Sequence, residues 1–397
     1  MIYVGIDIAK DKHDCFIKKT NGEYIDTFTV SNNIEGFEIL YTNILKFNTE
    51  SEEIKVGLEA TGHYGYNLIA YLLKHNIKVY VINPLHTNLY RKSMSLRLTK
   101  TDKIDSCTIV SMLMANLNLK AYTDLNFITD ELRSLTRYRY EKVKDRAKFR
   151  STVSKLICIL FPELEKMVST VHSPSIYALL LKYPDAEQIS RAHLTKITNI
   201  LLTKSKGHYE KNTAIQIREA ARKSIGINMP VMSLELQHTI ILLNEIEEQI
   251  NEIEEKIKII MDEIDSPITT IPGINYRMGA MILAEIGDFS RFSSPDKILA
   301  YAGMSPTIYQ SGQIEQTSYA HMEKRGSKYL RYALFNATKY VCLWDPIFRE
   351  YLAKKREEGK SYTVAVTHAT KKLVRLIYSL EKNHEEYMEK IKKHNKL

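Results

Sequence analysis

The chain opens on a strict alternation of apolar and polar or small positions. Ile2, Val4, Ile6 and Ile8 recur at every second residue, which is the pattern of a strand with one apolar face. Asp7 therefore lies on the opposite face of a strand that is otherwise suited to burial. A buried carboxylate is costly unless a cation or a proton meets it. The alternative for Asp7 alone is a strand-end aspartate that points into solvent.

The same patterning predicts a compact order of elements in the first part of the chain. Alternation and the Asn21-Gly22 turn signal predict further strands at 13–18, 24–30, 54–59 and 78–82. Helical spacing predicts helices at 34–47, with Phe37, Leu40, Ile44 and Leu45 facing inward, at 66–74 and at 102–116. Three strands followed by helix, strand, helix, strand and helix is the order of the α/β ribonuclease-H-like fold, the RuvC-like scaffold of nucleases and transposases.

Acidic residues fall at three informative places in this order. Asp7 is in the first strand, Glu59 ends the fourth, and Asp102 and Asp105 begin the last helix at a spacing that shares one face. Four converging carboxylates would repel one another without cations, and two Mg²⁺ ions about 4 Å apart would resolve this in phosphodiester chemistry, with Mn²⁺ as a substitute. The alternative is that Asp102 caps its helix and Asp105 faces solvent.

Charge and cysteine usage narrow the function classes. The net charge of +9 favours a polyanionic partner but does not establish one. The four cysteines form no CxxC pair, which argues against a zinc ribbon or a disulfide framework and suits a reducing cytoplasm. We find no secretory leader and no run near the ~18 apolar residues of a membrane helix. The expectation is a cytoplasmic, nucleoid-associated protein without a membrane partner.

A basic segment begins at Glu131 and is interleaved with aromatic residues. A helix of this kind can grip a phosphate backbone while its aromatic rings stack on bases. The alternative is a solvated helix face whose aromatic rings pack on a neighbouring element. The first interpretation assigns nucleic-acid binding to Arg133, Arg137, Arg139, Lys142, Lys144, Arg146, Lys148 and Arg150.

A long apolar seam follows in the middle of the chain. Between residues 234 and 264 the apolar positions step by threes and fours, at Leu236, Leu243, Ile246, Ile250, Ile253, Ile257, Ile260 and Ile264. This predicts a coiled coil, whose partner is either the basic helix at 131–161 or a helix of a second protomer. A further unit begins at Ser266-Pro267, where IPGI at 271–274 suggests a helix-hairpin-helix element. The predicted domains are 1–130, 131–265 and 266–397, the last ending in a helical tail.

The motifs together resemble one family, the DEDD-type insertion-sequence transposases with a RuvC-like N-terminal domain and a C-terminal serine domain. At the N-terminal end these are GIDIAK around Asp7, LEATGHY after Glu59, and TDKIDS around Asp102 and Asp105. At the C-terminal end they are IPGI, FSRFSSPDKILAYAGMSP, QSG at 310–312 and KRGSKYLRYAL from 324. The resemblance covers roughly residues 1–150 and 266–350. Gln310 and Gln313 stand where the family often has a second serine and a second glycine.

The resemblance implies a second catalytic group and a set of partners. Asp7, Glu59, Asp102 and Asp105 match the family's catalytic, metal-binding acids, and Ser311 matches its nucleophilic serine. It implies that the serine attacks a DNA phosphodiester and forms a covalent phosphoserine link, assisted by metals supplied by a different protomer. It also implies a structured bridge RNA that pairs with target and donor DNA, and a homo-oligomer, either a dimer or a tetramer.

Elementary chemistry is consistent with these roles. A serine hydroxyl needs a base or a metal to activate it, and His321 is the only histidine near Ser311. Phosphate clamps at a helix N-terminus are predicted at Lys324, Arg325, Lys328 and Arg331. His63 follows Glu59 closely and is a further candidate to approach substrate.

The predicted function is therefore a DNA recombinase, an enzyme that excises and inserts its own mobile element by transesterification. The first rival is a RuvC-type metal-dependent nuclease that hydrolyses branched DNA. The second is a nucleic-acid-binding protein with an inactive ribonuclease-H-like fold.

Overall fold

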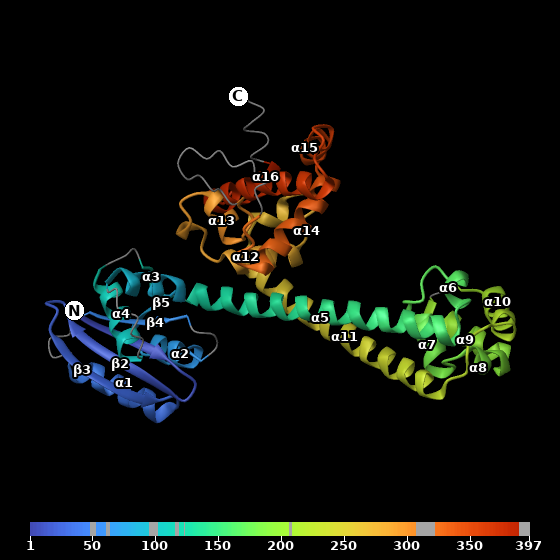
Figure 1. The fold of residues 1–397 in the computed structure, drawn as a ribbon, viewed down its shortest axis with the longest axis horizontal. Helices are drawn as coiled ribbons and strands as arrows, with labels where there is room; N and C mark the ends of the chain where they lie inside the picture. The colour runs from blue at the N-terminus through green and yellow to red at the C-terminus, as the bar shows by residue number, and fades with distance from the viewer. Residues whose placement is uncertain are drawn as a thin grey trace. The chain divides into compact units, whose positions relative to one another are not determined.

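The computed structural model divides the chain into two compact units, residues 1–126 and 127–397, each described here by itself (Figure 1). The structure describes residues 1–47, 53–60, 64–94, 102–115, 119–122, 124–205, 209–306 and 322–388. The unit boundary falls four residues before the predicted end of the first domain at 130. No helix in these ranges has an apolar stretch long enough to cross a bilayer.

Unit 1 is built on a five-stranded mixed sheet. The strands are β1 (Ile2–Ile8), β2 (Lys12–Lys19), β3 (Tyr24–Ser31), β4 (Ile54–Glu59) and β5 (Lys78–Ile82). Their spatial order is β3-β2-β1-β4-β5. β1, β2 and β3 are antiparallel neighbours, whereas β4 runs parallel to both β1 and β5. This is the strand order and direction of the ribonuclease-H-like fold, as the sequence predicts.

Helices cover both faces of this sheet. α1 (Ile34–Lys46) and α2 (Tyr66–Lys74) share a core with the buried side chains of β1, β2 and β4. α4 (Asp102–Met114) packs on the other face, where Val110 and Leu113 contact Tyr3 and Phe16. α1 begins where the sequence suggests because the Asn33 side chain accepts a hydrogen bond from the Gly36 amide.

Two details of unit 1 differ from the sequence prediction. Leu45 was expected to face inward but is 44% exposed, because it follows Ile44, which takes the inward position of that turn. A helix that the hydrophobic pattern did not reveal, α3 (Pro84–Met94), follows β5 and packs on α4.

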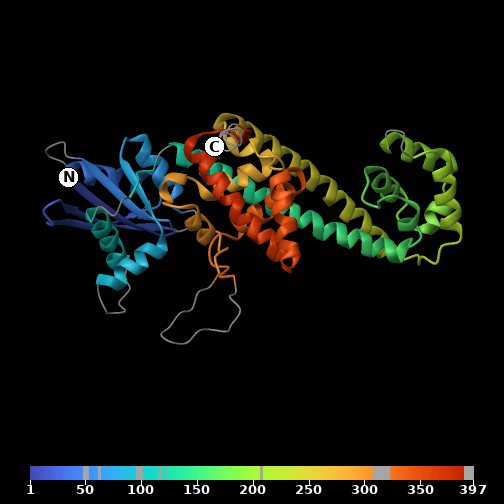
Figure 2. The ribbon, with the colours of Figure 1, turned by 90° about the horizontal axis from the view of Figure 1, so that it is seen from above.

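The named elements of unit 2 are all helices within the described residues. α5 (Asp124–Leu160) and α11 (Pro230–Ile264) run side by side in both views (Figures 1 and 2). Leu132 shares a core with Ile257, while Leu156 shares one with Leu236, so the two helices are antiparallel. The sequence left the partner of the α11 seam open between the basic helix and a second protomer. In this structure the basic helix of the same chain occupies that position.

Short helices connect α5 to α11 and form a separate core with their ends. They are α6 (Leu164–Met167), α7 (Pro174–Lys182), α8 (Ala186–Arg191), α9 (Leu194–Ser205) and α10 (Lys211–Arg222). Their apolar side chains cluster with Leu156 of α5 and Ile240 of α11. The far end of the helix pair is therefore closed by its own small helical cap (Figure 2).

The C-terminal helices pack around the other end of α11. They comprise η1 (Pro267–Thr270), α12 (Tyr276–Ile286), η2 (Phe289–Arg291), α13 (Pro295–Tyr301), α14 (Lys328–Trp344), α15 (Pro346–Glu357) and α16 (Tyr362–Asn383). Their core joins Ile257 of α11 with the fully buried Ala284, Leu334 and Leu373. Gly273 has a φ of +95° and lies so close to the Tyr340 backbone that a Cβ would be 2.6 Å from it. The IPGI turn is thus a close packing contact with α14.

Candidate active site

The parallel pairing of β1 with β4 places two of the predicted acids at neighbouring positions. The register pairs Ile6 with Leu58, so Asp7 and Glu59 are the next residues along the two strands. Ile6 and Leu58 are buried in the core shared with α1 and α2. Because side chains alternate along a strand, Asp7 and Glu59 point to the opposite face, where α4 lies. Both side chains are half-buried.

Glycines on that face allow α4 to come close to the strands. An added Cβ at Gly5 would lie 2.2 Å from the Ser106 carbonyl oxygen, and one at Gly57 would lie 2.8 Å from side-chain atoms of Ile109 and Leu113. Glycine is needed at residue 5 because the obstructing atom belongs to the helix backbone. This contact fixes the start of α4 above the strand that carries Asp7.

Replacing Gly5 with alanine is therefore expected to destabilise unit 1 by about 1–3 kcal/mol, since the helix must shift to relieve the overlap. Chemical denaturation of the intact protein measures this. Gly65→Ala is the matched control, because its added Cβ would meet only the ends of side chains, with the Ile8 side chain nearest at 3.3 Å. Equal stability of the two variants would show that the α4 contact is not tight.

Asp105 lies in the first half of α4, next to the Ser106 contact, and its side chain is only 8% exposed. Its Oδ1 accepts a hydrogen bond from Nη1 of Arg91 on α3 at 2.6 Å. The other guanidinium nitrogen of Arg91, Nη2, donates to Asn88 Oδ1 at 3.1 Å. The alternative in which Asp105 faces solvent is wrong, since this carboxylate is buried and held by a cation.

The acids that the structure describes suit a hard divalent cation. Asp7, Glu59 and Asp105 offer only carboxylate oxygens, the ligands that Mg²⁺ prefers, and the buried Asp105 is already met by a positive charge. Asp102 is the first residue of α4, and its side chain lies outside the described residues. Within the described part of the chain no three metal-binding side chains stand close enough to form a complete site.

Sequence reasoning missed Arg91, although a local signal exists. Asn83 followed by Pro84 was interpreted as the end of a strand, but proline is also favoured in the first turn of a helix. Arg91 and Lys92 then occupy the last turn of that helix. What could not be seen is the partner, because Asp105 is 14 residues away, on a different helix.

The predicted nucleic-acid-binding arginines of α5 are engaged in ion pairs within the chain. Arg139 contacts Glu254 of α11 at 2.6 Å, while Arg146 and Arg150 both contact Glu247 at 2.9 and 2.8 Å. Arg133 is paired with Asp130 and donates through Nε to the Ala284 carbonyl at 2.8 Å. These side chains join α5 to α11 and α12, which is a structural role.

Three of the predicted contacts on α5 are lysines. Lys142 and Lys148 are half-buried and exposed, respectively. Lys144 is paired with Glu141 at 3.1 Å on the same helix. The aromatic Tyr140 packs edge-on against Tyr329 and Tyr332 of α14, so this ring is used in packing.

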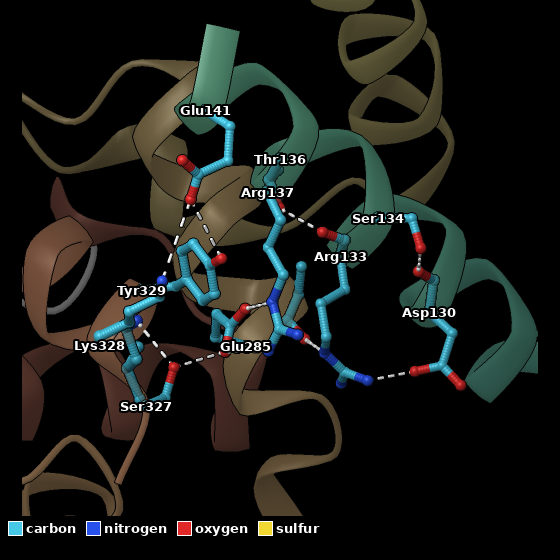
Figure 3. Close-up of polar contacts among 12 residues, drawn as sticks. Asp130, Arg133, Ser134, Thr136, Arg137, Glu141, Glu285, Ser327, Lys328 and Tyr329 are labelled. Atoms are coloured by element: carbon cyan, nitrogen blue, oxygen red, sulfur yellow. Dashed lines mark hydrogen bonds and ion pairs between the residues drawn. The ribbon is translucent and has the colours of Figure 1, made fainter. Parts of the chain in front are cut away.

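A buried carboxylate organises the junction of α5, α12 and α14 (Figure 3). Glu285 of α12 is fully buried. Arg137 donates to both of its oxygens, from Nε at 2.6 Å and Nη2 at 3.0 Å, and the Ser327 hydroxyl donates to Oε2 at 2.6 Å. Burial alone would lower the pKa of Arg137, but the hydrogen bonds and charge of Glu285 outweigh this and raise that pKa. The Ser327 oxygen also caps α14 by accepting from the Leu330 amide.

Removing Arg137 is expected to cost about 2–3 kcal/mol of stability, because it leaves a buried carboxylate without its cation; screening of the half-exposed arginine lowers this figure. We expect this of Arg137→Leu in chemical denaturation. Arg222→Leu is the matched control, since Arg222 is 47% exposed, close to the 42% of Arg137, but its partner Glu219 is itself 50% exposed. Similar losses for the two variants would contradict a special role for the Glu285 pair.

Of the predicted phosphate clamps at the start of α14, Arg331 is bound to the backbone of its own chain, whereas Lys324, Arg325 and Lys328 are exposed. Arg331 donates to the carbonyls of Ala302 at 2.9 Å and Lys324 at 3.3 Å, so it holds the local backbone. Lys328 lies 4.0 Å from Glu141. Arg325 is 88% exposed and Lys324 is exposed.

These residues follow the segment that contains the predicted nucleophile. Ser311 and His321 lie outside the described residues, as does His63 in unit 1. The two described ends of that segment are paired, with a bridge between Pro306 and Met322 and a hydrogen bond from the Glu323 amide to the Ser305 carbonyl at 3.1 Å.

The comparisons with protein families match two parts of the chain to transposases. A family model described as "Transposase" matches residues 4–162, and a second, described as "Transposase IS116/IS110/IS902 family", matches residues 265–353. Both matched parts of the chain are therefore similar to transposases of the IS110/IS116 family.

Curated relatives match over nearly their whole length. The 44.8 kDa protein of insertion element IS116 from Streptomyces clavuligerus is 23% identical over 96% of this chain and 94% of its own. The pilin gene-inverting protein of Moraxella bovis is 24% identical over 95% of each chain. Among solved structures, Thermus thermophilus RuvC in complex with a Holliday junction substrate is 11% identical and covers 31% of this chain and 99% of its own, with a TM-score of 0.24.

Proposed function

We propose that this transposase cleaves and rejoins the DNA of an insertion sequence with divalent metal ions held by the acids of unit 1. The observation that carries this proposal is the register of β1 and β4, which makes Asp7 and Glu59 neighbours on the face covered by α4. Asp105, buried at the start of that helix, supplies a third carboxylate, and Asp102 at its first residue is the fourth.

In this proposal the four acids hold Mg²⁺, with Mn²⁺ as a substitute. The bound ions would polarise the scissile phosphate and stabilise the departing oxygen. The chain itself contributes rigidity, because the glycine contact at residue 5 fixes α4 over the strands. A rigid carboxylate set favours the demanding octahedral geometry of magnesium.

We further propose that Ser311 is the nucleophile and that its hydroxyl oxygen forms a phosphodiester with DNA while the 3′ or 5′ oxygen of the broken strand leaves. The motif resemblance supports this assignment. The residues on either side of the segment that contains Ser311 are paired with each other through the bridge between Pro306 and Met322. His321 is the only histidine near Ser311 in the sequence, and the metal-bound acids of unit 1 are the proposed activators of the serine.

DNA and a guide RNA are the proposed partners. Lys148 and Lys324 are exposed cations that could contact phosphate groups, and Arg325 is exposed as well, 4.0 Å from Glu323. The name of the Moraxella bovis relative, a pilin gene-inverting protein, also concerns a DNA rearrangement. We propose in addition that α5 and α11 pack as a coiled coil, that the IPGI turn acts as a helix-hairpin-helix element, and that the active form is a dimer or a tetramer.

The second candidate is a RuvC-type nuclease that hydrolyses branched DNA. The carboxylates of unit 1 favour it, because they could activate water without any group from unit 2. The two functions differ in the fate of the cut strand.

Incubation with labelled DNA that contains the joined ends of the element, with Mg²⁺ and co-expressed flanking RNA, distinguishes them. A protein-linked strand that resists denaturation supports the recombinase. Nicks with free ends and no protein-linked strand support the nuclease, and intact DNA under all conditions would refute both.

A further inference from the structure

Arg91 and Asp105 form the most deeply placed ion pair that the structure shows in unit 1. The Asp105 side chain is 8% exposed and the Arg91 side chain 25% exposed, with Nη1 and Oδ1 2.6 Å apart. Removing a carboxylate from water is unfavourable unless a cation compensates it. Arg91 supplies that compensation at the residue that the proposed function assigns to a metal ion.

The position of Arg91 does not depend on this pair. α3 packs on α4 through Tyr90, whose ring joins Ile109 and Met112 and whose hydroxyl donates to the Ser111 carbonyl at 3.5 Å. Thr87 on the same helix is buried as well. The guanidinium is also oriented from its own helix, because Nη2 donates to Asn88 at 3.1 Å. The packing of α3 on α4 therefore positions Arg91 next to Asp105.

A guanidinium and a divalent ion compete for the same carboxylate. Arg91 occupies Oδ1 of Asp105 with a charge-assisted hydrogen bond, and a metal ligand must direct a lone pair of that group at the ion. Two cations at one small carboxylate also repel each other. Binding a metal at Asp105 must accordingly break or weaken the contact with Arg91.

We propose that Arg91 is a positioning residue of the metal site, a cation of this chain that orients the Asp105 carboxylate until a divalent ion displaces the guanidinium. This rests on the proposed function, since it takes Asp105 as a metal ligand. A displaced guanidinium at this place would lie beside the bound ion and be available to a DNA phosphate oxygen.

The proposal predicts that loss of Arg91 strengthens metal binding, whereas a purely structural role predicts no such gain. If Arg91 only supported the fold, its loss would weaken metal binding or leave it unchanged. If Arg91 competes with the ion, Arg91→Gln binds Mn²⁺ about tenfold more tightly than the wild type, the factor expected for removal of one charge-assisted contact.

Calorimetric titration of the intact protein with Mn²⁺ and with Ca²⁺, without DNA, measures this. Lys92→Gln is the matched control, because it removes the same charge from the next, exposed residue of α3, and we expect its dissociation constant within about twofold of wild type at ordinary salt. Combining Arg91→Gln with Asp105→Asn is expected to abolish the gain, which assigns it to this carboxylate.

The outcomes separate the two claims. The proposal is supported if Arg91→Gln binds Mn²⁺ more tightly than the wild type and Lys92→Gln does not. Measurable binding by Arg91→Gln also supports it where the wild type binds too weakly to measure. Unchanged or weaker binding, or an equal gain in Lys92→Gln, overturns it. Absence of Mn²⁺ and Ca²⁺ binding in every variant overturns the metal site itself and with it the proposed function. Should Arg91→Gln fail to fold, Arg91→Lys serves in its place, with a smaller gain supporting the proposal and no gain overturning it.

Discussion

Asp7→Asn is expected to lower DNA cleavage by at least about a hundredfold while leaving the fold intact, because a metal ligand loses its charge but not its shape. Asp7 follows Ile6 in β1, and Glu59 follows its register partner Leu58 in β4, so the two acids lie at neighbouring positions on the two strands. Asparagine keeps an oxygen and a similar volume, which spares the packing beneath α4. Initial rates of Mg²⁺-dependent cleavage measure the effect.

Glu38→Gln is the matched control for this variant. Glu38 is an exposed acid of α1, which covers the opposite face of the sheet, and its loss removes the same charge from the same unit. Its cleavage rate should stay close to wild type. If Asp7→Asn cleaves as fast as Glu38→Gln, and both melt like the wild type, the acids of unit 1 are not the catalytic site.

Ser311→Ala is expected to abolish the covalent protein–DNA product and to lower strand exchange by about a thousandfold or more, because the substitution removes the proposed nucleophilic hydroxyl. The assignment rests on the QSG motif at 310–312. Denaturing electrophoresis of protein incubated with labelled DNA measures the product.

Ser318→Ala tests a second serine of the same segment and should form the covalent product at the wild-type rate. Loss of the product in Ser318→Ala but not in Ser311→Ala would identify Ser318 as the nucleophile instead of Ser311. Persistence in both variants would place it outside this segment.

Unit 1 could be predicted from the sequence because its signals are local. Alternation predicts the strands, Asn21-Gly22 predicts the hairpin of β2 and β3, and the limits of α2 and β5 agree with the prediction to the residue. α3 was missed because its sequence is polar and lacks a continuous apolar stripe, since it packs on α4 through little more than Thr87 and Tyr90.

The arginines of α5 show what a single sequence conceals. Eight cations within twenty residues, 131–150, are typical of nucleic-acid binding. The acids that neutralise Arg137, Arg139 and Arg146 lie 148, 115 and 101 residues further along the chain. Local charge density therefore gives no information on whether a cation is already paired. The pairing is decided by α11 and α12, which bring their acids next to α5.

Glu285 was not singled out for the same reason. Glu285 is an acid in a largely apolar helix and belongs to no recognisable sequence motif. Its partners are Arg137 on α5 and Ser327 at the start of α14. Only the assembled junction reveals a carboxylate that orients the start of α14. The acids of unit 1 were easier to predict, because the strand order alone brings Asp7 and Glu59 together.

The most direct test of the account is to identify the amino acid joined to DNA and the groups that its formation needs. The protein is incubated with DNA of the joined element ends, Mg²⁺ and flanking RNA, digested, and analysed by mass spectrometry. The account predicts a nucleotide on the peptide that contains Ser311, present with wild-type protein and absent with Asp7→Asn or with a chelator. A linked nucleotide that forms equally well in Asp7→Asn, or cleavage without any linked peptide, would contradict it.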